Sequence, residues 1–225
     1  MRSYRAVLFD LDGTLADTAA DLGYALNLQR RSRGLEPVAL DLVRPRASAG
    51  ARGLLQLGFG VEPGHPEYEA MRSEFLDLYS CHLSRSTTLF PGVSEMLFEL
   101  EHRGVRWGIV TNKPQRFTFP LLRALGLSER CACTVCGDMV KAPKPHPAGL
   151  LEAAGRLGES PACCLYVGDD ERDVIAARAA GMDSVAALYG YLGDAKPPRD
   201  WGATAVIGSP RDLVLLPGLG AASVW

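Results

Sequence analysis

No stretch of the sequence is apolar over the roughly 20 residues that a membrane-spanning helix needs. The first apolar segment, residues 6–9, is also too short for a secretory signal and runs straight into Asp10. A basic surplus is lacking too. The formal net charge is -2 and the Lys and Arg residues are scattered, which disfavours binding to nucleic acid or to an acidic membrane. We therefore expect a cytoplasmic protein whose partners are neither nucleic acids nor membranes.

A zinc-binding arrangement of cysteines is also lacking. Three of the six cysteines, Cys131, Cys133 and Cys136, lie close together, but no second group has the paired spacing of a structural zinc site. Cys163 and Cys164 lie within an apolar run, where a free thiol behaves as a small hydrophobic side chain. We interpret the cysteines as structural residues that the cytoplasm keeps reduced.

What the sequence does contain is the composition of a globular protein. Of its 225 residues, 47% are hydrophobic and 22% are charged, a balance that disfavours disorder. This length is enough for one large domain, or for one domain that carries a smaller insert. The order of the expected helices and strands decides between the two.

Four short apolar runs end in polar residues, as strands do when both faces of their sheet are covered. They span residues 6–9, 105–110, 163–167 and 184–188, with a weaker fifth candidate at 203–207. Helical patterns lie between them at 91–103, 114–125, 147–157 and 171–180, and each is followed by glycine. Strands that alternate with helices predict an α/β fold, with a Rossmann-like parallel sheet and helices on both faces.

Residues 17–85 do not follow this alternation. They contain helical patterns at 18–31, 50–57 and 67–83. We interpret the segment as a helical cap domain inserted after the first strand, over a core domain of residues 1–16 and 86–225. Such an insert can form a lid over the edge of the sheet where ligands bind.

Polar residues follow the predicted strands, and in an open α/β sheet ligands bind at the edge where parallel strands end. These residues are Asp10, Asp12, Thr111, Asn112, Asp169, Asp170 and Asp173. Several carboxylates in one pocket repel each other, so either a cation holds them there or their pKa values rise. Because all-oxygen ligands favour a hard cation, and near phosphate that cation is magnesium, we expect Mg²⁺.

Four motifs in these regions resemble those of the haloacid dehalogenase superfamily. They are Asp10-Leu11-Asp12-Gly13-Thr14, then Thr111-Asn112, then Lys144-Pro145-His146-Pro147, and finally Gly168-Asp169-Asp170-Glu171-Arg172-Asp173. All four stand in the family's order, so the resemblance covers nearly the whole chain. It implies a hydrolase with a Rossmann-like core and an inserted helical cap.

The resemblance also implies how the first motif works. Asp10 is the nucleophile that attacks phosphorus and becomes an aspartyl-phosphate, which splits a difficult hydrolysis into two easier steps. Asp12 protonates the leaving oxygen and later takes a proton from the attacking water. Asp12 reaches the same ligand only if the chain bends after Asp10, and Gly13 favours such a bend.

The same resemblance implies the ligands of the magnesium ion. Asp10, Asp169 and the backbone carbonyl of Asp12 are expected to bind the metal, and Asp173 is expected to support the metal or a neighbouring lysine. Whether Asp170 also binds the metal stays open, since an aspartate after a strand is often a helix cap.

An acid at position 12 is typical of the phosphatases and phosphomutases of this superfamily. A phosphomutase must protect its phospho-aspartate from water, and nothing in the sequence demands this. A non-catalytic phosphate-binding module is a further alternative, because fold alone does not prove activity. Such a module would not need both Asp10 and Asp12, so we expect a phosphatase.

Two phosphatase groups remain open as models for the substrate. The chain most resembles the phosphoglycolate phosphatase group, on Phe90-Pro91-Gly92, Thr111-Asn112-Lys113 and Tyr189-Gly190-Tyr191. Residues 48–53 and 199–203 resemble a related subgroup that acts on N-acetylmuramic acid 6-phosphate in cell-wall recycling. Phosphoglycolate is the first choice and N-acetylmuramic acid 6-phosphate the alternative.

The expected partner is thus a small phosphorylated metabolite. The resemblance assigns Thr111, Asn112 and Lys144 to its phosphoryl group, whose charge the transition state redistributes. Arg52, in the predicted cap, is our candidate for contacting a carboxylate, which both substrates carry; a solvated helix arginine is the alternative. The chain is expected to be a monomer or a homodimer.

Overall fold

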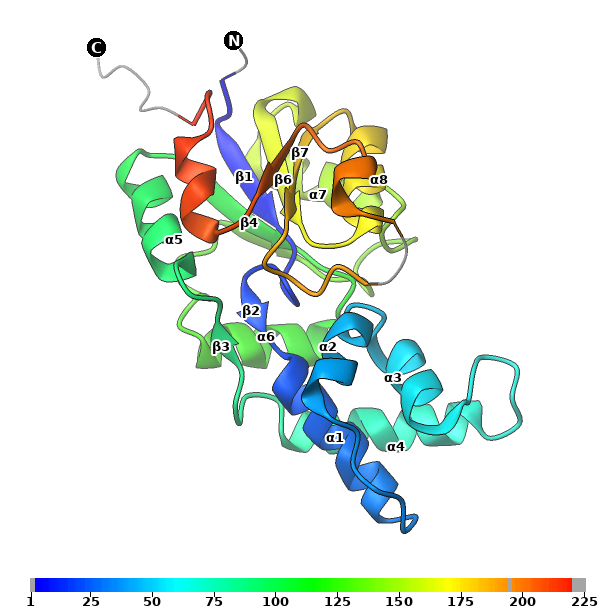
Figure 1. Cartoon of the computed structure of the whole chain (residues 1–225). Coiled ribbons are helices and arrows are strands. Elements are labelled where there is room, and N and C mark those ends of the chain that lie inside the picture. Colours follow the sequence, from blue (N-terminus) through cyan, green and yellow to red (C-terminus); the bar gives the residue numbers. More distant parts are fainter. Residues whose placement is uncertain (1–2, 194–195, 220–225) are drawn as a thin grey trace.

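The computed structural model describes residues 3–193 and 196–219, in which an α/β core lies beside a group of helices (Figure 1). The sheet has six parallel strands in the order β5-β4-β1-β6-β7-β8. They are β1 (Ala6–Phe9), β4 (Arg106–Val110), β5 (Cys133–Val135), β6 (Cys164–Gly168), β7 (Asp183–Ala187) and β8 (Ala205–Ile207). The predicted α/β fold class is confirmed, and the weaker fifth candidate is β8.

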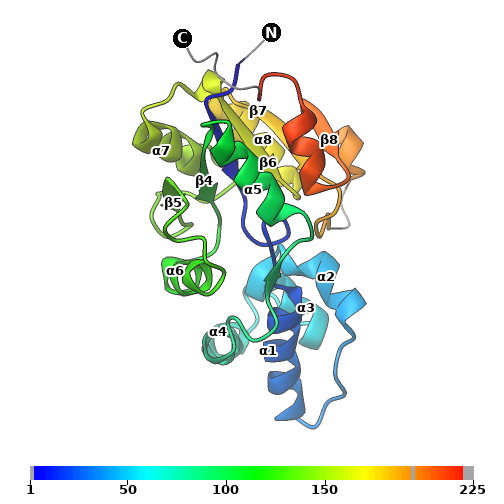
Figure 2. The same ribbon diagram turned by 90° about the vertical axis from the view of Figure 1, so that its left-hand side faces the viewer.

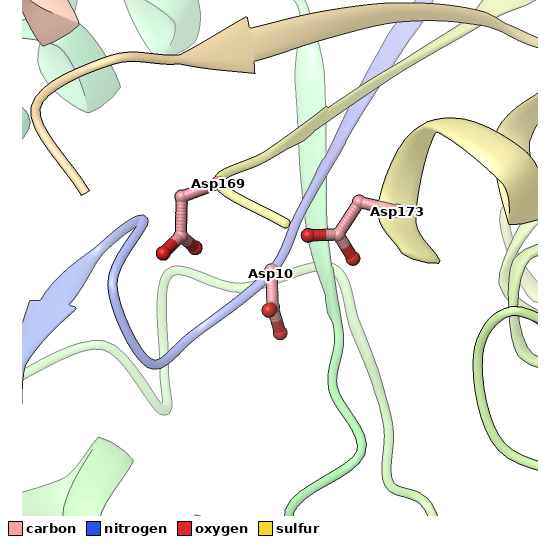
Figure 3. A group of neighbouring side chains, drawn as sticks. All are labelled: Asp10, Asp169 and Asp173. Carbon is pink, nitrogen blue, oxygen red and sulfur yellow. The ribbon is translucent and has the colours of Figure 1, made fainter. Parts of the chain in front are cut away.

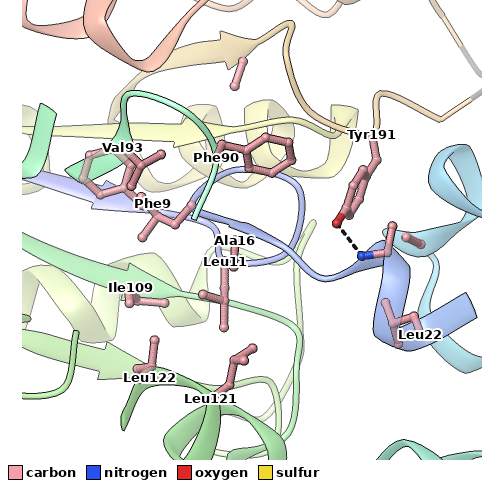
Figure 4. Close-up of a cluster of buried hydrophobic side chains, with 14 of the residues drawn as sticks. Phe9, Leu11, Ala16, Leu22, Phe90, Val93, Ile109, Leu121, Leu122 and Tyr191 are labelled. Atoms are coloured by element: carbon pink, nitrogen blue, oxygen red, sulfur yellow. Dashed lines mark hydrogen bonds between the residues drawn. The ribbon is translucent and has the colours of Figure 1, made fainter. Parts of the chain in front are cut away.

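Helices cover both faces of this sheet. The core helices are α5 (Val93–His102), α6 (Gln115–Ala124), α7 (Ala148–Leu157) and α8 (Glu171–Ala180), with 3-10 helices η1 (Pro161–Cys163), η2 (Pro198–Asp200) and η3 (Pro210–Leu215). Within β1, Val7 and Phe9 join a hydrophobic cluster with α5 and η3, part of which Figure 4 shows. Ala6 and Leu8 join a second cluster with α7 and α8 on the opposite face. This alternation is the two-residue period of a strand.

The segment predicted as a cap contains four helices. They are α1 (Ala19–Arg31), α2 (Leu40–Ala47), α3 (Gly50–Phe59) and α4 (Tyr68–Cys81). Figures 1 and 2 both show them beyond the end to which β1 runs, so they lie over the carboxyl edge of the sheet. None of the helices in the described residues is both long enough and apolar enough to cross a membrane.

The sequence patterns predicted neither α2 nor β5. The helix α2 contains Pro45, and only two of its residues, Val43 and Ala47, are buried, so it has no clear apolar stripe. The strand β5 has three residues, of which only Val135 is buried. Buried side chains of α1, α3 and α4 belong to the same cluster as those of the sheet, so the domain limits at residues 16 and 86 stay a prediction.

The six cysteines are all free thiols, and Cys136 and Cys164 are buried. Burial raises the pKa of Cys133 to about 12 and that of Cys164 to about 11. A thiol that stays protonated is a poor nucleophile and a poor metal ligand, so both residues act as packing side chains.

The chain passes between the core and the four helices twice, and the two passages pair with each other. β2 (Ala16–Asp17) and β3 (Thr88–Leu89) form a two-stranded antiparallel ribbon. Beside it, the buried carboxylate of Asp21 on α1 accepts hydrogen bonds from the backbone of Ser86 and from both the backbone and the hydroxyl of Thr87, at 2.7–3.0 Å. Asp21 therefore fastens the entering helix to the returning chain.

We expect Asp21→Ala to destabilise the protein strongly. Because it removes an ionised acceptor and leaves the buried N–H and hydroxyl groups of Thr87 without this partner, it should lower the free energy of unfolding by about 3 kcal/mol or more, measured by chemical denaturation. The control is Asp77→Ala, which removes an exposed carboxylate on α4 and should change the free energy by no more than about 0.5 kcal/mol. Equal effects of the two substitutions would contradict this role.

Candidate active site

The site begins where two neighbouring strands end. β1 and β6 pair with Phe9 opposite Val167, so Asp10 and Asp169 follow at the same edge of the sheet. Asp173 projects from the first turn of α8. Each of the three carboxylates places an oxygen within 4.8 Å of the others, and Figure 3 shows Asp169 and Asp173 on either side of Asp10.

A buried lysine faces two of these carboxylates. The Nζ atom of Lys144 lies 2.9 Å from Oδ1 of Asp10 and donates to Oδ1 of Asp173 at 2.7 Å and to the hydroxyl of Tyr166 at 2.8 Å. Burial lowers the pKa of Lys144, but the charges of Asp10 and Asp173 outweigh this and raise it above the usual value. The lysine is therefore an ammonium, as binding a phosphoryl group requires.

The side chain of Asn112, a residue assigned to the phosphoryl group, binds the backbone of Lys144. Its Oδ1 accepts a hydrogen bond from the backbone N–H of Lys144 at 2.8 Å, and its Nδ2 donates to the carbonyl of the same residue at 3.0 Å. Both polar groups of the amide are thus used to hold the backbone of Lys144. The side chain positions the lysine, which leaves the backbone of Asn112 as the part that can meet a phosphoryl oxygen.

Asp169 occupies a space that two glycines leave open. Gly13 has a φ of 87°, so the chain bends after Asp12 as predicted, and a Cβ atom there would overlap the carboxylate of Asp169. A Cβ atom at Gly190 would overlap the Cβ of Asp169. The carboxylate itself accepts hydrogen bonds from the hydroxyl of Thr14 at 2.7 Å and from the backbone N–H of Tyr191 at 2.8 Å.

The electrostatics of this cluster call for a cation. Burial raises the pKa of Asp10 to about 6, with Lys144 opposing the rise and Asp173 adding to it. Burial, together with the charges of Asp10 and Asp173, raises the pKa of Asp169 well above its usual value. An all-oxygen donor set this close suits a hard divalent ion, whose charge would relieve the repulsion. The residues present therefore fit a metal of the kind predicted.

The carboxylate of Asp12 lies outside this cluster. Its Oδ1 accepts hydrogen bonds from the hydroxyl of Thr18 at 2.5 Å and from Nζ of Lys113 at 2.8 Å. Among the described residues, nothing donates to its Oδ2. The side chain is not in the three-carboxylate group, and the expected contact of Asp12 with a metal is through its backbone carbonyl.

Asp170 caps α8, and its side chain does not join the cluster. Its Oδ1 accepts hydrogen bonds from the backbone N–H of Arg172 at 2.9 Å and from Nε at 2.7 Å, and its Oδ2 accepts one from Nη2 at 2.8 Å. Burial raises the pKa of Asp170, but the hydrogen bonds and charge of Arg172 lower it below its usual value. The structure thus favours the helix-cap interpretation over direct metal binding.

A cavity of about 320 Å³ opens in front of these residues, between the core and the helices α2–α4. Core residues on its wall include the buried Thr111, whose hydroxyl accepts a hydrogen bond from the backbone N–H of Lys113 at 3.1 Å. The exposed Arg52, on α3, also lines it, and within the described part of the chain no carboxylate pairs with its guanidinium. The cavity walls combine Asp10, Asp12, Thr111, Asn112, Lys113 and Lys144 with Arg52, Arg72, Phe75, Leu76 and Tyr79.

Sequence reasoning missed three residues that support the site. Thr14 and Tyr191 both hold Asp169, and the hydroxyl of Tyr191 also accepts the backbone N–H of Ala19 at 2.8 Å, which Figure 4 shows as a dashed line. Lys113 pairs with Asp12, 101 residues away. All three lie in or beside motifs that the sequence analysis quotes. The motifs therefore indicated that these residues lie near the site, but they did not indicate which distant residue each one binds.

Comparison with known proteins agrees with this geometry. The model of the haloacid dehalogenase-like hydrolase family matches residues 7–187. A crystal structure of a predicted phosphoglycolate phosphatase from Haemophilus somnus 129pt superposes with a TM-score of 0.84 at 28% identity. That match covers 96% of this chain and 98% of the other.

Two relatives are more similar in sequence. The phosphoglycolate phosphatase of Xanthomonas campestris pv. campestris (strain 8004) is 47% identical over 214 residues, which cover 95% of this chain and 96% of the relative. The N-acetylmuramic acid 6-phosphate phosphatase of Pseudomonas aeruginosa is 42% identical over 210 residues, which cover 93% of each chain. At this identity over nearly the whole length, the protein is a phosphoric monoester hydrolase. It belongs to the haloacid dehalogenase-like hydrolase family, as its four motifs predict.

Proposed function

We propose that this protein is a magnesium-dependent phosphatase that hydrolyses a small, carboxylate-bearing phosphate ester through an aspartyl-phosphate at Asp10. The observation that supports the proposal is that an unpaired carboxylate oxygen of Asp10 lies beside the buried ammonium of Lys144. Oδ1 of Asp10 faces Lys144 and accepts the N–H of Leu11, whereas Oδ2 accepts no hydrogen bond from the described residues and the side chain lines the cavity. A carboxylate oxygen is thus free to attack beside a cation that can hold the phosphoryl group.

The reaction follows from these positions in two steps. Lys144 and Thr111 hold the phosphoryl oxygens while Oδ2 of Asp10 bonds to phosphorus, the bond to the leaving oxygen breaks, and Asp12 gives that oxygen its proton. A water molecule then attacks the phosphorus, Asp12 takes its proton back from the water, and the bond from Asp10 to phosphorus breaks. Inorganic phosphate leaves, and both aspartates return to their starting states.

Magnesium would be held by Asp10, Asp169 and the backbone carbonyl of Asp12, with Asp173 supporting Lys144. When bound, it supplies positive charge against the phosphoryl oxygens and lets two anionic groups approach each other. The protein's own contribution is to hold these carboxylates rigidly, through the glycines and hydrogen bonds around Asp169.

Phosphoglycolate is our first candidate substrate, because the relative at 47% identity carries that name and Arg52 offers a partner for a carboxylate. N-acetylmuramic acid 6-phosphate is a second candidate, favoured by the size of the cavity. At about 320 Å³ it is large for a two-carbon acid. Its volume lies at the lower end of the range, roughly 300–1,000 Å³, of pockets that enclose drug-sized ligands. A phosphomutase or a non-catalytic module has no such observation in its favour.

The covalent mechanism predicts the effect of removing the nucleophile. Asp10→Asn should lower kcat on p-nitrophenyl phosphate with magnesium by at least about 1,000-fold, because the amide cannot form the phospho-enzyme. Acid quenching during turnover should trap a phosphoryl group on Asp10 of the unaltered enzyme, detected by mass spectrometry of the peptide. Asp77→Asn, on the outside of α4, is the matched control and should keep full activity. Wild-type activity in the Asp10 variant would rule out the mechanism.

Metal binding predicts a stability change that does not depend on turnover. Saturating magnesium, at about 100 times its dissociation constant, should stabilise the folded protein by about 2.7 kcal/mol, seen as a rise in Tm. Because burial raises the pKa of Asp10 to about 6, the metal-free fold binds protons that the unfolded chain has released. Protons and metal then compete, so the rise should be larger near about pH 8 than near about pH 5.

Asp169→Asn is the matched variant for this measurement, since it removes one charge from the metal-binding group and keeps the shape of the side chain. The magnesium-dependent rise in Tm should be lost in it. A rise of the same size in both proteins would show that the ion binds elsewhere.

The proposed contact of Arg52 with a carboxylate predicts that only substrates with a carboxylate lose activity when Arg52 is replaced. Arg52→Ala should lower kcat/KM for phosphoglycolate and for N-acetylmuramic acid 6-phosphate by about 30-fold, the cost of losing a charge-assisted hydrogen bond. Activity on p-nitrophenyl phosphate, which has no carboxylate, should change little. Arg123→Ala, an exposed arginine on α6 outside the cavity, is the control. If Arg52→Ala affects all three substrates alike, Arg52 is a solvated helix residue.

The same assay on the unaltered enzyme ranks the two candidates. A true substrate should reach a kcat/KM of about 10⁴ M⁻¹s⁻¹ or more.

A further inference from the structure

Lys113 is a buried cation in the cavity wall that the reaction above does not use. It follows β4 directly after Thr111 and Asn112, and its side chain is only 7% exposed. Its Nζ atom donates to Oδ1 of Asp12 at 2.8 Å. A buried ammonium must have a partner, and the partner here is the residue expected to move the proton.

Two other cations of the cavity have different partners. Lys144 pairs with Asp10 and Asp173, and Arg172 pairs with Asp170. Lys113 is thus the cation that the described residues place on Asp12. Its contact is to Oδ1, which also accepts the hydroxyl of Thr18, while nothing in the described chain donates to Oδ2. Two donors on one oxygen fix the rotation of the carboxyl group, and the residue lines the cavity.

Lys113 is itself held on both sides. Its backbone N–H donates to the hydroxyl of Thr111 at 3.1 Å, and its carbonyl accepts the hydroxyl of Thr118 at 3.3 Å. On the side of the cap, Nζ lies 4.7 Å from the ring centre of Tyr79, on α4. Although burial lowers it, the charge of Asp12 raises the pKa of Lys113, so the group stays an ammonium. The lysine is therefore fixed by the phosphoryl-binding turn and covered by an aromatic ring of the cap.

We propose that Lys113 is a positioning residue for Asp12, holding Oδ1 so that Oδ2 meets the leaving oxygen of the substrate. This inference rests on the proposed function, in which Asp12 exchanges the proton. A buried ion pair is an expensive way to gain stability, because desolvation offsets most of the attraction. Orienting one oxygen of the Asp12 carboxyl group would raise the rate of proton transfer, which gives the ion pair a function other than stability.

The test uses leaving groups that differ in their need for a proton. An alkyl leaving group, as in phosphoglycolate or glycerol phosphate, departs as a strong base and depends on the acid, whereas p-nitrophenolate leaves readily without it. Lys113→Met should lower kcat/KM for the alkyl esters by about 100-fold, the low end of general acid catalysis, and for p-nitrophenyl phosphate by less than about fivefold. Lys113→Arg, which keeps the charge, should recover most of the activity on the alkyl esters.

Lys141→Met is the matched control, because it removes an exposed lysine that does not line the cavity, and the alkyl-to-aryl ratio should stay at its wild-type value. Tyr79→Leu is the second variant, in case Lys113→Met does not fold. It uncovers the ion pair and should lower the ratio of kcat/KM on alkyl esters to kcat/KM on p-nitrophenyl phosphate by roughly threefold or more, the size of a cation–π contact.

An equal loss on both kinds of ester, or a change in KM alone, would overturn the proposal and make Lys113 a substrate-binding or purely structural residue.

The failure of this inference is distinguishable from the failure of the proposed function. If the unaltered enzyme hydrolyses neither kind of ester with magnesium, the phosphatase proposal itself is wrong. If it hydrolyses both and Lys113→Met leaves the ratio of the two unchanged, only the role of Lys113 is wrong.

Discussion

Burial of three carboxylates against a single lysine is the constraint on which the rest of the structure depends. Carboxylate oxygens of Asp10, Asp169 and Asp173 lie within 4.8 Å of one another, and among the described residues Lys144 is the ammonium that pairs with two of them, Asp10 and Asp173. Burial raises the pKa of Asp10 and Asp169, so the cluster resists carrying its full charge. A site of this kind must take up protons or a cation, and its stability is therefore coupled to its chemistry.

The same cluster reaches the point where the chain enters the cap. The backbone of Tyr191 donates to Asp169, and its hydroxyl accepts the N–H of Ala19, the first residue of α1. Asp21, two residues further on, fastens α1 to the returning chain at Ser86 and Thr87. One tyrosine thus connects a carboxylate of the predicted metal site to the start of the cap.

The edge of the sheet was predictable because it depends on local patterns. Apolar runs end at Asp10 and Asp169, and the parallel topology brings both to one place. The choice of partner was not predictable. The side chain of Asn112 turns to the backbone of Lys144, 32 residues away, and Lys113 turns to Asp12, 101 residues away. The periodicity of a sequence does not determine which oxygen a side chain will contact. The motifs therefore predicted which residues lie near the site, but not which partner each side chain binds.

In the proposed function, the core carries out the reaction and the cap determines which substrate is preferred. In the proposed mechanism, Asp10, Lys144 and Asp12 contact only the phosphoryl group and the oxygen that leaves with the product, which every phosphate monoester has. In the same proposal, the atoms beyond that oxygen lie against the cap. Arg52 offers the same contact to any carboxylate, so it cannot by itself separate a two-carbon acid from a sugar acid. The aromatic wall of Phe75 and Tyr79 can, because only the larger substrate buries apolar surface against it. The preference of this enzyme should therefore depend on how much of that wall the leaving group covers.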